Sequence, residues 1–163
     1  MAPRTDDDIA WEEPFQLVKS PKSRGSAARK NEDVEELHQQ LKTITKQKDA
    51  AFGREKDLLD AIVGELWRRI NNTVVEGQTD LYNLDLHFMS PNAALKFAKK
   101  TIRKAERSED TKREMSIITG KGNNSKDGLP KIKPLVIDHL DSEGYQWRFD
   151  GENDGKIIFN VRK

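Results

Sequence analysis

Apolar residues in the first half of the chain recur at intervals of three and four, the spacing of one face of an α-helix. The pattern predicts a helical segment over residues 31–72, with Asn31 as its N-cap. A thin apolar stripe comes first, formed by Leu37, Leu41 and Ile44. A thicker stripe follows, formed by Leu58, Leu59, Ile62, Val63, Leu66, Trp67 and Ile70. Because Gly53 weakens a helix interior, we expect two helices, or one long helix weakened there. The second stripe is expected to be buried against the following domain or against another copy of the chain.

Beyond residue 81 the pattern changes to short apolar segments separated by turn residues. Ser90 caps a predicted helix that has Pro91 at its first position, and a second helix runs through residues 132–140 and ends at Gly144. The buried stripe of the first helix is expected to consist of Ala94, Leu95, Ala98, Ile102 and Ala105. The predicted strands span residues 81–87, 114–119, 145–149 and 156–162, the last two joined by a polar turn at 150–155. The order β-α-β-α-β-β predicts an α/β fold, a two-layer sandwich with a mixed sheet whose first two strands are parallel.

Composition divides the chain into four segments. Apolar residues make up 34% of the 163 residues and charged residues 35%, so part of the chain is expected to stay solvated. We expect a disordered tail over residues 1–30, the helical segment over 31–72, a linker over 73–80 and a folded domain over 81–163. Within the tail, residues 11–18 place bulky apolar side chains among acidic ones, which suits either an unconstrained tail or a docking peptide for a protein partner.

Charge is distributed unevenly, although the net charge is only +1. Residues 1–76 carry 13 Lys and Arg against 15 Asp and Glu, and residues 77–163 carry 16 against 13, so the positive excess lies in the predicted folded domain. The chain contains no cysteine, which excludes disulfides, thiol nucleophiles and thiolate zinc sites. No apolar run is long enough for a membrane span or a signal peptide, and we expect a cytoplasmic or nuclear protein.

Two polar residues stand at the end of the first predicted strand. Because side chains alternate along a strand, Leu84 and Leu86 are expected to face the helices while Asp85 and His87 share the opposite face. Ligands of open α/β sheets bind beyond the carboxyl ends of the strands. An imidazole exchanges a proton near neutral pH, and a carboxylate two residues earlier can orient it. The position therefore predicts a catalytic pair of Asp85 and His87, although an ordinary solvated strand face has the same residue pattern.

A glycine-containing loop follows the second predicted strand, after Thr119. Lys121 in this loop supplies a positive charge for a phosphate under attack, which makes it the third catalytic candidate. The loop residues expected to contact nucleic acid are Gly120, Gly122, Asn123, Asn124 and Ser125. A Gly-x-Gly sequence by itself is usually only a tight connection, but beside Asp85 and His87 it supplies the other half of a phosphodiester site.

The helix after the first predicted strand has a basic face. Its cations recur at spacings of three or four and are Lys96, Lys99, Lys100, Arg103 and Arg107. No carboxylate between Pro91 and Ala105 offsets them, so the face predicts either a track for phosphates with salt-dependent affinity or an ordinary solvated surface. No cluster of acids or histidines has metal-ligand spacing, so neither a metal nor another cofactor is expected, and His38 and His139 are assigned no role.

These motifs resemble those of the Smr domain, the small MutS-related family. The segments that carry the resemblance are Leu84-Asp85-Leu86-His87, Ile117 to Ser125, and Lys131-Ile132-Lys133-Pro134. The resemblance runs from about residue 81 to 163 and implies a fold similar to the C-terminal domain of bacterial translation initiation factor three. Members of the family include DNA-nicking endonucleases and endoribonucleases, some of which cut messenger RNA at stalled ribosomes. The resemblance therefore implies endonuclease activity at Asp85, His87 and the glycine loop, with RNA or DNA as partner and the ribosome as a further candidate.

Two positions depart from the family pattern. Phe88 stands where the family usually has glycine after the histidine, so it either crowds the site or offers a surface for a base. Thr119 stands where many members have histidine, a variant that resembles eukaryotic members and removes one candidate proton carrier.

Three hypotheses follow. The leading one is a metal-independent endonuclease in which His87 handles the proton, Asp85 orients His87, and Lys121 with the loop amides holds the phosphate. RNA is the favoured substrate, because its 2′-hydroxyl is an internal nucleophile. The second hypothesis is a non-catalytic adaptor that binds nucleic acid or a ribosome. The third is a scaffold that forms a homodimer through residues 31–72.

Overall fold

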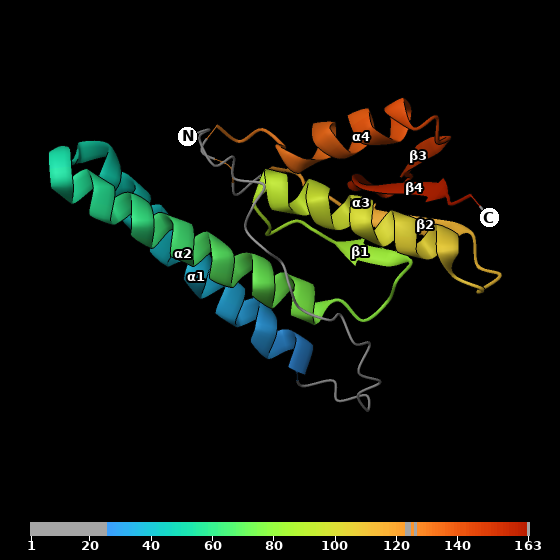
Figure 1. The fold of residues 1–163 in the computed structure, drawn as a ribbon, viewed down its shortest axis with the longest axis horizontal. Coiled ribbons are helices and arrows are strands. Elements are labelled where there is room, and N and C mark those ends of the chain that lie inside the picture. The colour runs from blue at the N-terminus through green and yellow to red at the C-terminus, as the bar shows by residue number, and fades with distance from the viewer. Residues whose placement is uncertain (1–25, 123–124, 126, 163) are drawn as a thin grey trace, which may run out of the picture.

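A helical hairpin and an α/β domain make up the computed structural model of this protein (Figure 1). The structure describes the backbone of residues 26–122, 125 and 127–162, and the side chains of these residues from Asp33 onward. The predictions made for residues 1–25, including the docking peptide, lie outside the described residues. In Figure 1 the tip of the hairpin points away from the sheet.

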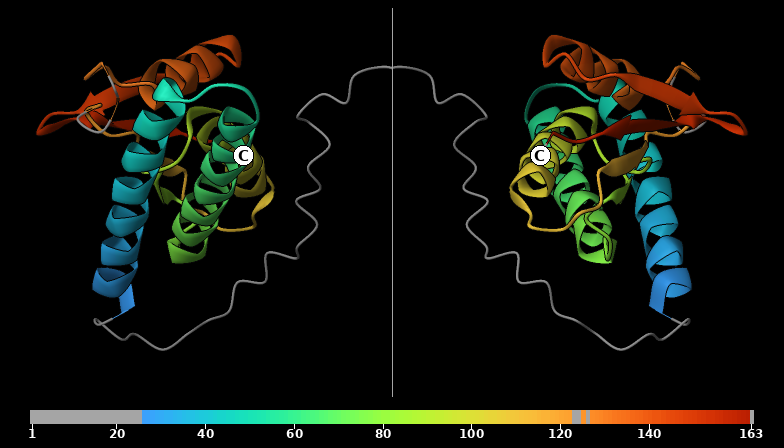
Figure 2. Two further views of the ribbon diagram at one scale, coloured as in Figure 1. Left: turned by 90° about the vertical axis from the view of Figure 1, so that its left-hand side faces the viewer. Right: turned by 90° about the vertical axis from the view of Figure 1, so that its right-hand side faces the viewer.

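The hairpin consists of α1 (Ser26–Ala50) and α2 (Gly53–Gly77), which lie side by side (Figure 2). The chain reverses at Gly53, whose φ of 58° lies in the left-handed region that glycine adopts without strain. The two helices bury a common apolar cluster of Val34, Leu37, Leu41, Leu66 and Ile70. Of the two alternatives predicted, the structure has two helices separated near Gly53. Leu66 and Ile70 of the second stripe are buried against α1, rather than against the following domain or another copy of the chain as expected.

The first helix begins earlier than predicted. Because α1 starts at Ser26, Asn31 lies inside the helix rather than at its N-cap, and residues 26–30 are helical rather than disordered. The residues that precede Asn31 include Ala27, Ala28, Arg29 and Lys30. All four are strong helix formers, so the helix extends through them without a cap at Asn31.

The second helix ends later than predicted. Because α2 continues through Gly77, most of the predicted linker over residues 73–80 is helical. Val74 and Val75 pack against the core of the α/β domain, and this burial offsets the weak helix propensity of β-branched residues. The hairpin is thus packed directly onto the domain that follows it.

The sheet has four strands: β1 (Asn83–Asp85), β2 (Glu114–Ile118), β3 (Trp147–Asp150) and β4 (Asn153–Asn160). Their order across the sheet is β1-β2-β4-β3. The pair β1 and β2 is parallel, whereas β4 is antiparallel to both β2 and β3. The predicted α/β class and the parallel first pair are confirmed, and β1 lies at one edge of the sheet.

Two helices pack on the sheet, α3 (Pro91–Arg107) and α4 (Ile132–Ser142). Ser90 and Pro91 occupy the N-cap and first position of α3 as predicted, and Gly144 follows α4 with a φ of 73°. Leu95 is only half-buried, so the stripe of α3 is narrower than predicted. The shared core includes Leu84, Leu86, Ala94, Ala98, Met115, Ile117, Val136, Leu140 and Ile157. None of the helices in the described part of the chain combines the length and apolarity needed to cross a membrane.

The boundaries of β1, β3 and β4 differ from the predictions. β1 has three residues instead of seven, because the chain turns after Leu86, where the amide of Met89 donates to its carbonyl. β4 begins at Asn153 rather than at Lys156, and β3 begins at Trp147. The polar residues predicted as a turn take part in backbone pairing with their neighbours, so the turn shrinks to residues 151–152.

Candidate functional site

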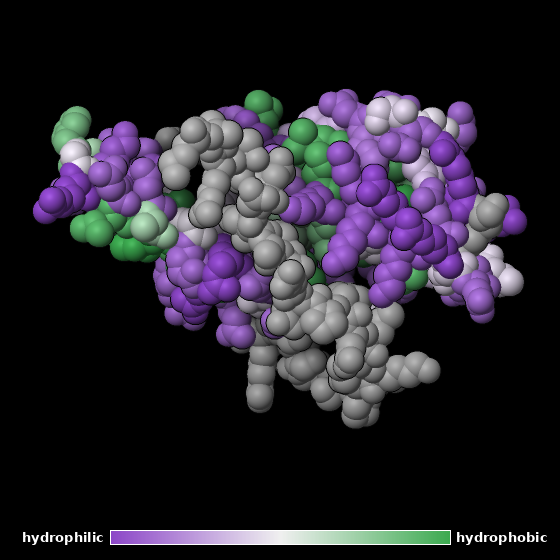
Figure 3. Space-filling model, in the orientation of Figure 1, coloured by the Kyte–Doolittle hydropathy of each residue, from purple (hydrophilic) through white to green (hydrophobic). Residues whose placement is uncertain are grey.

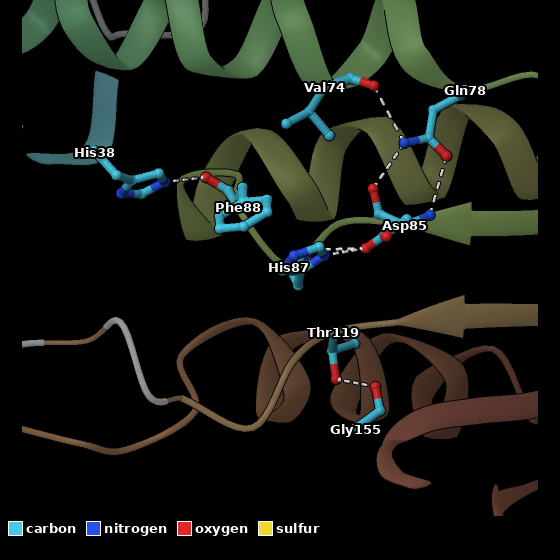
Figure 4. A network of polar contacts seen from close by, with 8 residues as sticks. All are labelled: His38, Val74, Gln78, Asp85, His87, Phe88, Thr119 and Gly155. Carbon is cyan, nitrogen blue, oxygen red and sulfur yellow. Dashed lines mark hydrogen bonds and ion pairs between the residues drawn. The ribbon is translucent and has the colours of Figure 1, made fainter. Parts of the chain in front are cut away.

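Asp85 and His87 form a close pair at the carboxyl end of β1 (Figure 4). The side chains of His87 and Asp85 are 33% and 45% exposed, whereas Leu84 and Leu86 are fully buried, so the predicted alternation of faces is present. Oδ1 of Asp85 contacts Nδ1 of His87 and also accepts the backbone amide of His87 at 3.3 Å. A neutral imidazole that donates from Nδ1 carries its lone pair on Nε2, the nitrogen that can then accept a proton.

The backbone of Asp85 is held on its outer side by Gln78, which follows the last residue of α2. The amide of Asp85 donates to Oε1 of Gln78 at 3.0 Å, and Nε2 of Gln78 donates to the carbonyl of Asp85 at 2.7 Å. Since β1 is an edge strand, these two groups of Asp85 have no strand to pair with on that side. The side-chain amide of Gln78 takes the place of the missing strand.

The ends of β1 and β2 meet at the glycine loop. The amide of Leu86 donates to the carbonyl of Ile118 at 2.8 Å, which continues the parallel pairing beyond β1. A Cβ atom added to Gly120 would lie 3.0 Å from Cβ of His87, and Gly120 has a φ of 78°. Both the conformation and the close approach therefore require glycine at this position. The geometry places His87 beside Gly120, as expected for neighbouring parallel strands.

Thr119 is buried and does not face the site. Its backbone amide and its Oγ1 both donate to the carbonyl of Gly155, at 2.7 and 3.0 Å. A Cβ atom on Gly155 would lie 3.1 Å from the backbone of Gly120, so β4 also supports the loop (Figure 4). Thr119 is therefore a structural residue that fixes the start of the loop.

The remaining loop residues have different positions. Lys121 is exposed, which suits a cation that meets a ligand from solvent. Oγ of Ser125 lies 2.7 Å from the carbonyl of Gly122 and 2.6 Å from that of Leu129, so this hydroxyl closes the loop on itself. The contacts predicted for Asn123 and Asn124 lie outside the described residues.

The basic face of α3 begins next to the site. Lys96, Lys100, Arg103 and Arg107 are exposed, and Lys99 is half-buried. Hydrophilic side chains gather over α3 in the space-filling view (Figure 3). The helix α3 begins four residues after the site histidine, and Lys96 and Arg107 are separated by about 16 Å along its axis. The cations therefore form a row that leads away from the site.

Phe88 links the site to the helical hairpin. Its ring lies 3.8 Å from that of His87, measured between centroids, and it packs against the apolar cluster of α1 and α2. His38 of α1 lies edge-on to Trp67, with its centroid 5.5 Å from Phe88, and its Nε2 donates to the Phe88 carbonyl at 2.9 Å. Phe88 is thus an anchor for the hairpin.

Sequence reasoning missed three residues that contact the site backbone: His38, Asn71 and Gln78. Asn71 is buried in α2, where its Nδ2 donates to Oγ of Ser90 at 3.0 Å and its Oδ1 accepts the amide of Ser90 at 2.9 Å. A histidine in a charged helix and two amides near a helix end have no distinctive local pattern. The one available signal for Asn71 was its place directly after the apolar stripe of α2, because a polar residue at a buried position needs a hydrogen-bond partner.

Burial lowers the pKa of His38 below its ordinary range. The hydrogen bond to the Phe88 carbonyl opposes this shift, and the neighbouring Lys42 and His87 add to it. Burial also lowers the pKa of His139, with a further contribution from Lys99. Both histidines are therefore biased toward the neutral form in the folded protein. Within the described part of the chain, no three acidic or histidine side chains come together in a way that could hold a metal ion.

Comparison with known proteins gives a match over the α/β domain. Residues 84–156 match the Smr domain family, and they run from β1 into β4. NEDD4-binding protein 2 from Homo sapiens is 30% identical over 99 residues, a match that covers 58% of this chain and 5% of that protein. The chain thus corresponds to a small part of this long relative.

Two solved structures are also similar to the chain. The solution structure of the B3BP Smr domain is 26% identical, and the match covers 60% of this chain and 90% of that domain with a TM-score of 0.44. The crystal structure of the human small-MutS related domain is 29% identical, with coverages of 48% and 99% and a TM-score of 0.41.

We expect Gly122→Ala to destabilise the protein more than Gly128→Ala. Both glycines have positive φ, 87° and 68°, so both substitutions carry a similar conformational cost. A Cβ on Gly122 would also lie 2.4 Å from the backbone nitrogen of Pro130, whereas nothing lies within 4 Å of a Cβ on Gly128. The free energy of unfolding, measured with urea, should fall by about 1–3 kcal/mol more for Gly122→Ala. Equal losses would contradict this packing of the loop.

We also expect the protein to lose stability as the pH falls below about 6.5, the ordinary pKa of histidine. Because the folded-state pKa of His38 is lowered, the unfolded chain binds the proton first, and the unfolding free energy decreases as the pH falls. His38→Gln keeps a donor without titrating, so its unfolding free energy should change less between pH 8 and 5.5. The unfolding free energy of His139→Gln should likewise change less than that of the wild type over this pH range. An unchanged pH dependence in His38→Gln would contradict the inferred pKa.

Proposed function

Because residues 84–156 form an Smr domain, we propose that this chain is an endonuclease that cleaves phosphodiester bonds, with RNA favoured over DNA. Smr domains are associated with nucleic-acid binding and with nuclease activity in general. The observation that carries the proposal is the position of His87, which contacts Asp85 through Nδ1 and lies against Gly120 of the glycine loop. Nicking of DNA is the second form of the same activity.

In the proposed reaction on RNA, the 2′-oxygen attacks phosphorus as Nε2 of His87 takes its proton. The bond from phosphorus to the 2′-oxygen forms, the bond to the 5′-oxygen breaks, and the leaving oxygen takes a proton from water. Asp85 stabilises the imidazolium that results, and Lys121 with the amides of the loop stabilises the charge on the phosphate. The internal nucleophile makes a metal ion unnecessary for this step.

Nucleic acid is proposed to bind along the loop and α3. The loop residues are Gly120, Gly122, Asn123, Asn124 and Ser125. The helix residues are Lys96, Lys99, Lys100, Arg103 and Arg107. Four of these five cations are exposed, and contacts between cations and phosphates give affinity that falls with salt and does not depend on base sequence.

A non-catalytic adaptor that binds nucleic acid or a ribosome is the alternative. The observation that favours it is the environment of Thr119, which stands where many family members have histidine. Its hydroxyl is buried and bonded to Gly155, so it supplies no proton to the site. The basic face of α3 would serve an adaptor equally well.

Protein partners and location are further proposals. Residues 11–18, outside the described residues, are proposed as a docking peptide for a protein partner. The name of NEDD4-binding protein 2 describes it as a binder of another protein. By analogy, we propose that this chain also binds a protein partner. The location that fits these partners is the cytoplasm or the nucleus.

A homodimer through residues 31–72 is also proposed, and it rests on the tip of the hairpin. Although α1 and α2 share a buried apolar cluster, three large apolar side chains nearer the tip stay exposed. They are Phe52 at 86%, Leu58 at 64% and Ile62 at 44%. A second hairpin packed against the first would remove these side chains from water.

We expect His87→Ala to reduce cleavage by about 10²- to 10⁴-fold while binding is retained, because a positioned acid or base contributes that much to the rate. The assay uses labelled RNA and DNA, single-stranded and duplex, in EDTA and in Mg²⁺. His139→Ala is the matched control, since it removes a histidine that lies on α4. Equal cleavage by His87→Ala and wild type would refute the assignment. Salt-sensitive binding without cleavage by the wild type would establish the adaptor.

We expect the full chain to sediment as a dimer and Leu58→Glu as a monomer, because a buried carboxylate opposes association. Sedimentation velocity at several protein concentrations measures the difference. Leu129→Glu is the control, because Leu129 is 59% exposed but lies in the α/β domain. A monomeric wild-type chain at high concentration would exclude the dimer.

A further inference from the structure

Two side chains of the helical hairpin, and that of Gln78 directly after it, hold the chain on both sides of His87. Gln78 binds the backbone of Asp85, two residues before the histidine. His38 binds the carbonyl of Phe88, the next residue. Asn71 binds the amide and the hydroxyl of Ser90, three residues after it. We call these three residues the hairpin clamp.

Pairing within the sheet holds only one side of this segment. β1 pairs with β2 over three residues, and one further hydrogen bond, from Leu86 to Ile118, extends the pairing toward His87. After Leu86 the chain leaves the sheet and turns. The described backbone contacts of residues 88 and 90 with other elements come from the hairpin, so the hairpin decides where the chain goes after the histidine.

The clamp is fixed by burial. His38 is 8% exposed and Asn71 5% exposed, and the partly buried ring of Phe88 packs against the apolar cluster of the hairpin. A buried polar group that loses its partner costs free energy, so these hydrogen bonds are kept in the folded state. Because Gln78 bonds both the amide and the carbonyl of Asp85, it restricts the strand in the same way as a neighbouring strand would.

We propose that the hairpin is part of the active site, and that Gln78, His38 and Asn71 are positioning residues which hold the ring of His87 against the glycine loop. This inference rests on the proposed endonuclease function. The three residues do not touch the reacting atoms. They fix the backbone from Asp85 to Ser90, and the ring of His87 is carried by that backbone beside Gly120. A displacement of about 1 Å at a catalytic group can reduce a rate about 10²-fold.

The test uses the full chain with four substitutions. Gln78→Met keeps the side-chain length and removes both hydrogen bonds to Asp85. His38→Leu removes the donor to Phe88, and His38→Gln restores a donor at nearly the same place. Gln40→Met is the matched control, because Gln40 is exposed on α1 and its one described hydrogen bond, to Glu36, is 3.5 Å long.

We expect Gln78→Met and His38→Leu to lower kcat for RNA cleavage about ten- to a hundredfold, with KM within about twofold of wild type. His38→Gln should recover most of the lost rate, and Gln40→Met should match the wild type. Thermal unfolding confirms that each variant is folded at the assay temperature. If Gln78→Met is unfolded, the comparison of kcat between His38→Leu and His38→Gln tests the proposal instead. Unchanged kcat in the folded variants, or a His38→Gln protein as slow as His38→Leu, would overturn the proposal.

A second measurement separates this inference from the proposed function. The ring nitrogen resonances of His87, followed by NMR against pH, report the contact between Nδ1 and Asp85 without any cleavage. If the wild-type chain cuts neither RNA nor DNA, the proposed function fails and these resonances decide on the clamp. A change in Gln78→Met that is absent from Gln40→Met supports the clamp, and identical titrations in wild type and Gln78→Met reject it.

Discussion

The parallel pairing of β1 with β2 is the interaction on which the site depends. It brings together two segments that are more than thirty residues apart, so that the turn after Leu86 and the loop after Thr119 begin at the same edge of the sheet. The hydrogen bond from Leu86 to Ile118 carries this pairing to the residue next to His87. Without it, an imidazole and a glycine loop would remain separate features of the chain.

The close approach of three backbones explains why glycine recurs here. Gly120 lies against His87 on one side and against Gly155 of β4 on the other, and a Cβ atom at either glycine would come within 3.1 Å of a neighbour. Thr119 completes the arrangement by bonding the Gly155 carbonyl twice. The loop is therefore supported by β4 as well as by β1.

The hairpin and the residue that follows it satisfy backbone groups that an edge strand leaves unpaired. An edge strand leaves amides and carbonyls without partners, and β1 is both an edge strand and the strand that carries the site. Gln78 satisfies those groups of Asp85, while Asn71 and His38 hold the chain where it leaves the sheet. The partly buried ring of Phe88 packs against the hairpin cluster and joins the two parts of the molecule through one aromatic side chain.

The sequence by itself determined the features that depend on near neighbours. Helical spacing predicted the two helices of the hairpin, and alternation along a strand predicted the face shared by Asp85 and His87. Ser90 and Pro91 predicted the start of α3, and Gly144 predicted the end of α4. Each of these patterns is set within a few residues. Tertiary structure decided the rest. His38 meets Phe88 across 50 positions and Asn71 meets Ser90 across 19, and no local pattern encodes such contacts. They arise because α1 and α2 bury their apolar faces against each other, while Val74, Val75 and Phe88 pack the hairpin onto the α/β domain. This packing brings the polar groups beside these side chains into hydrogen-bonding distance.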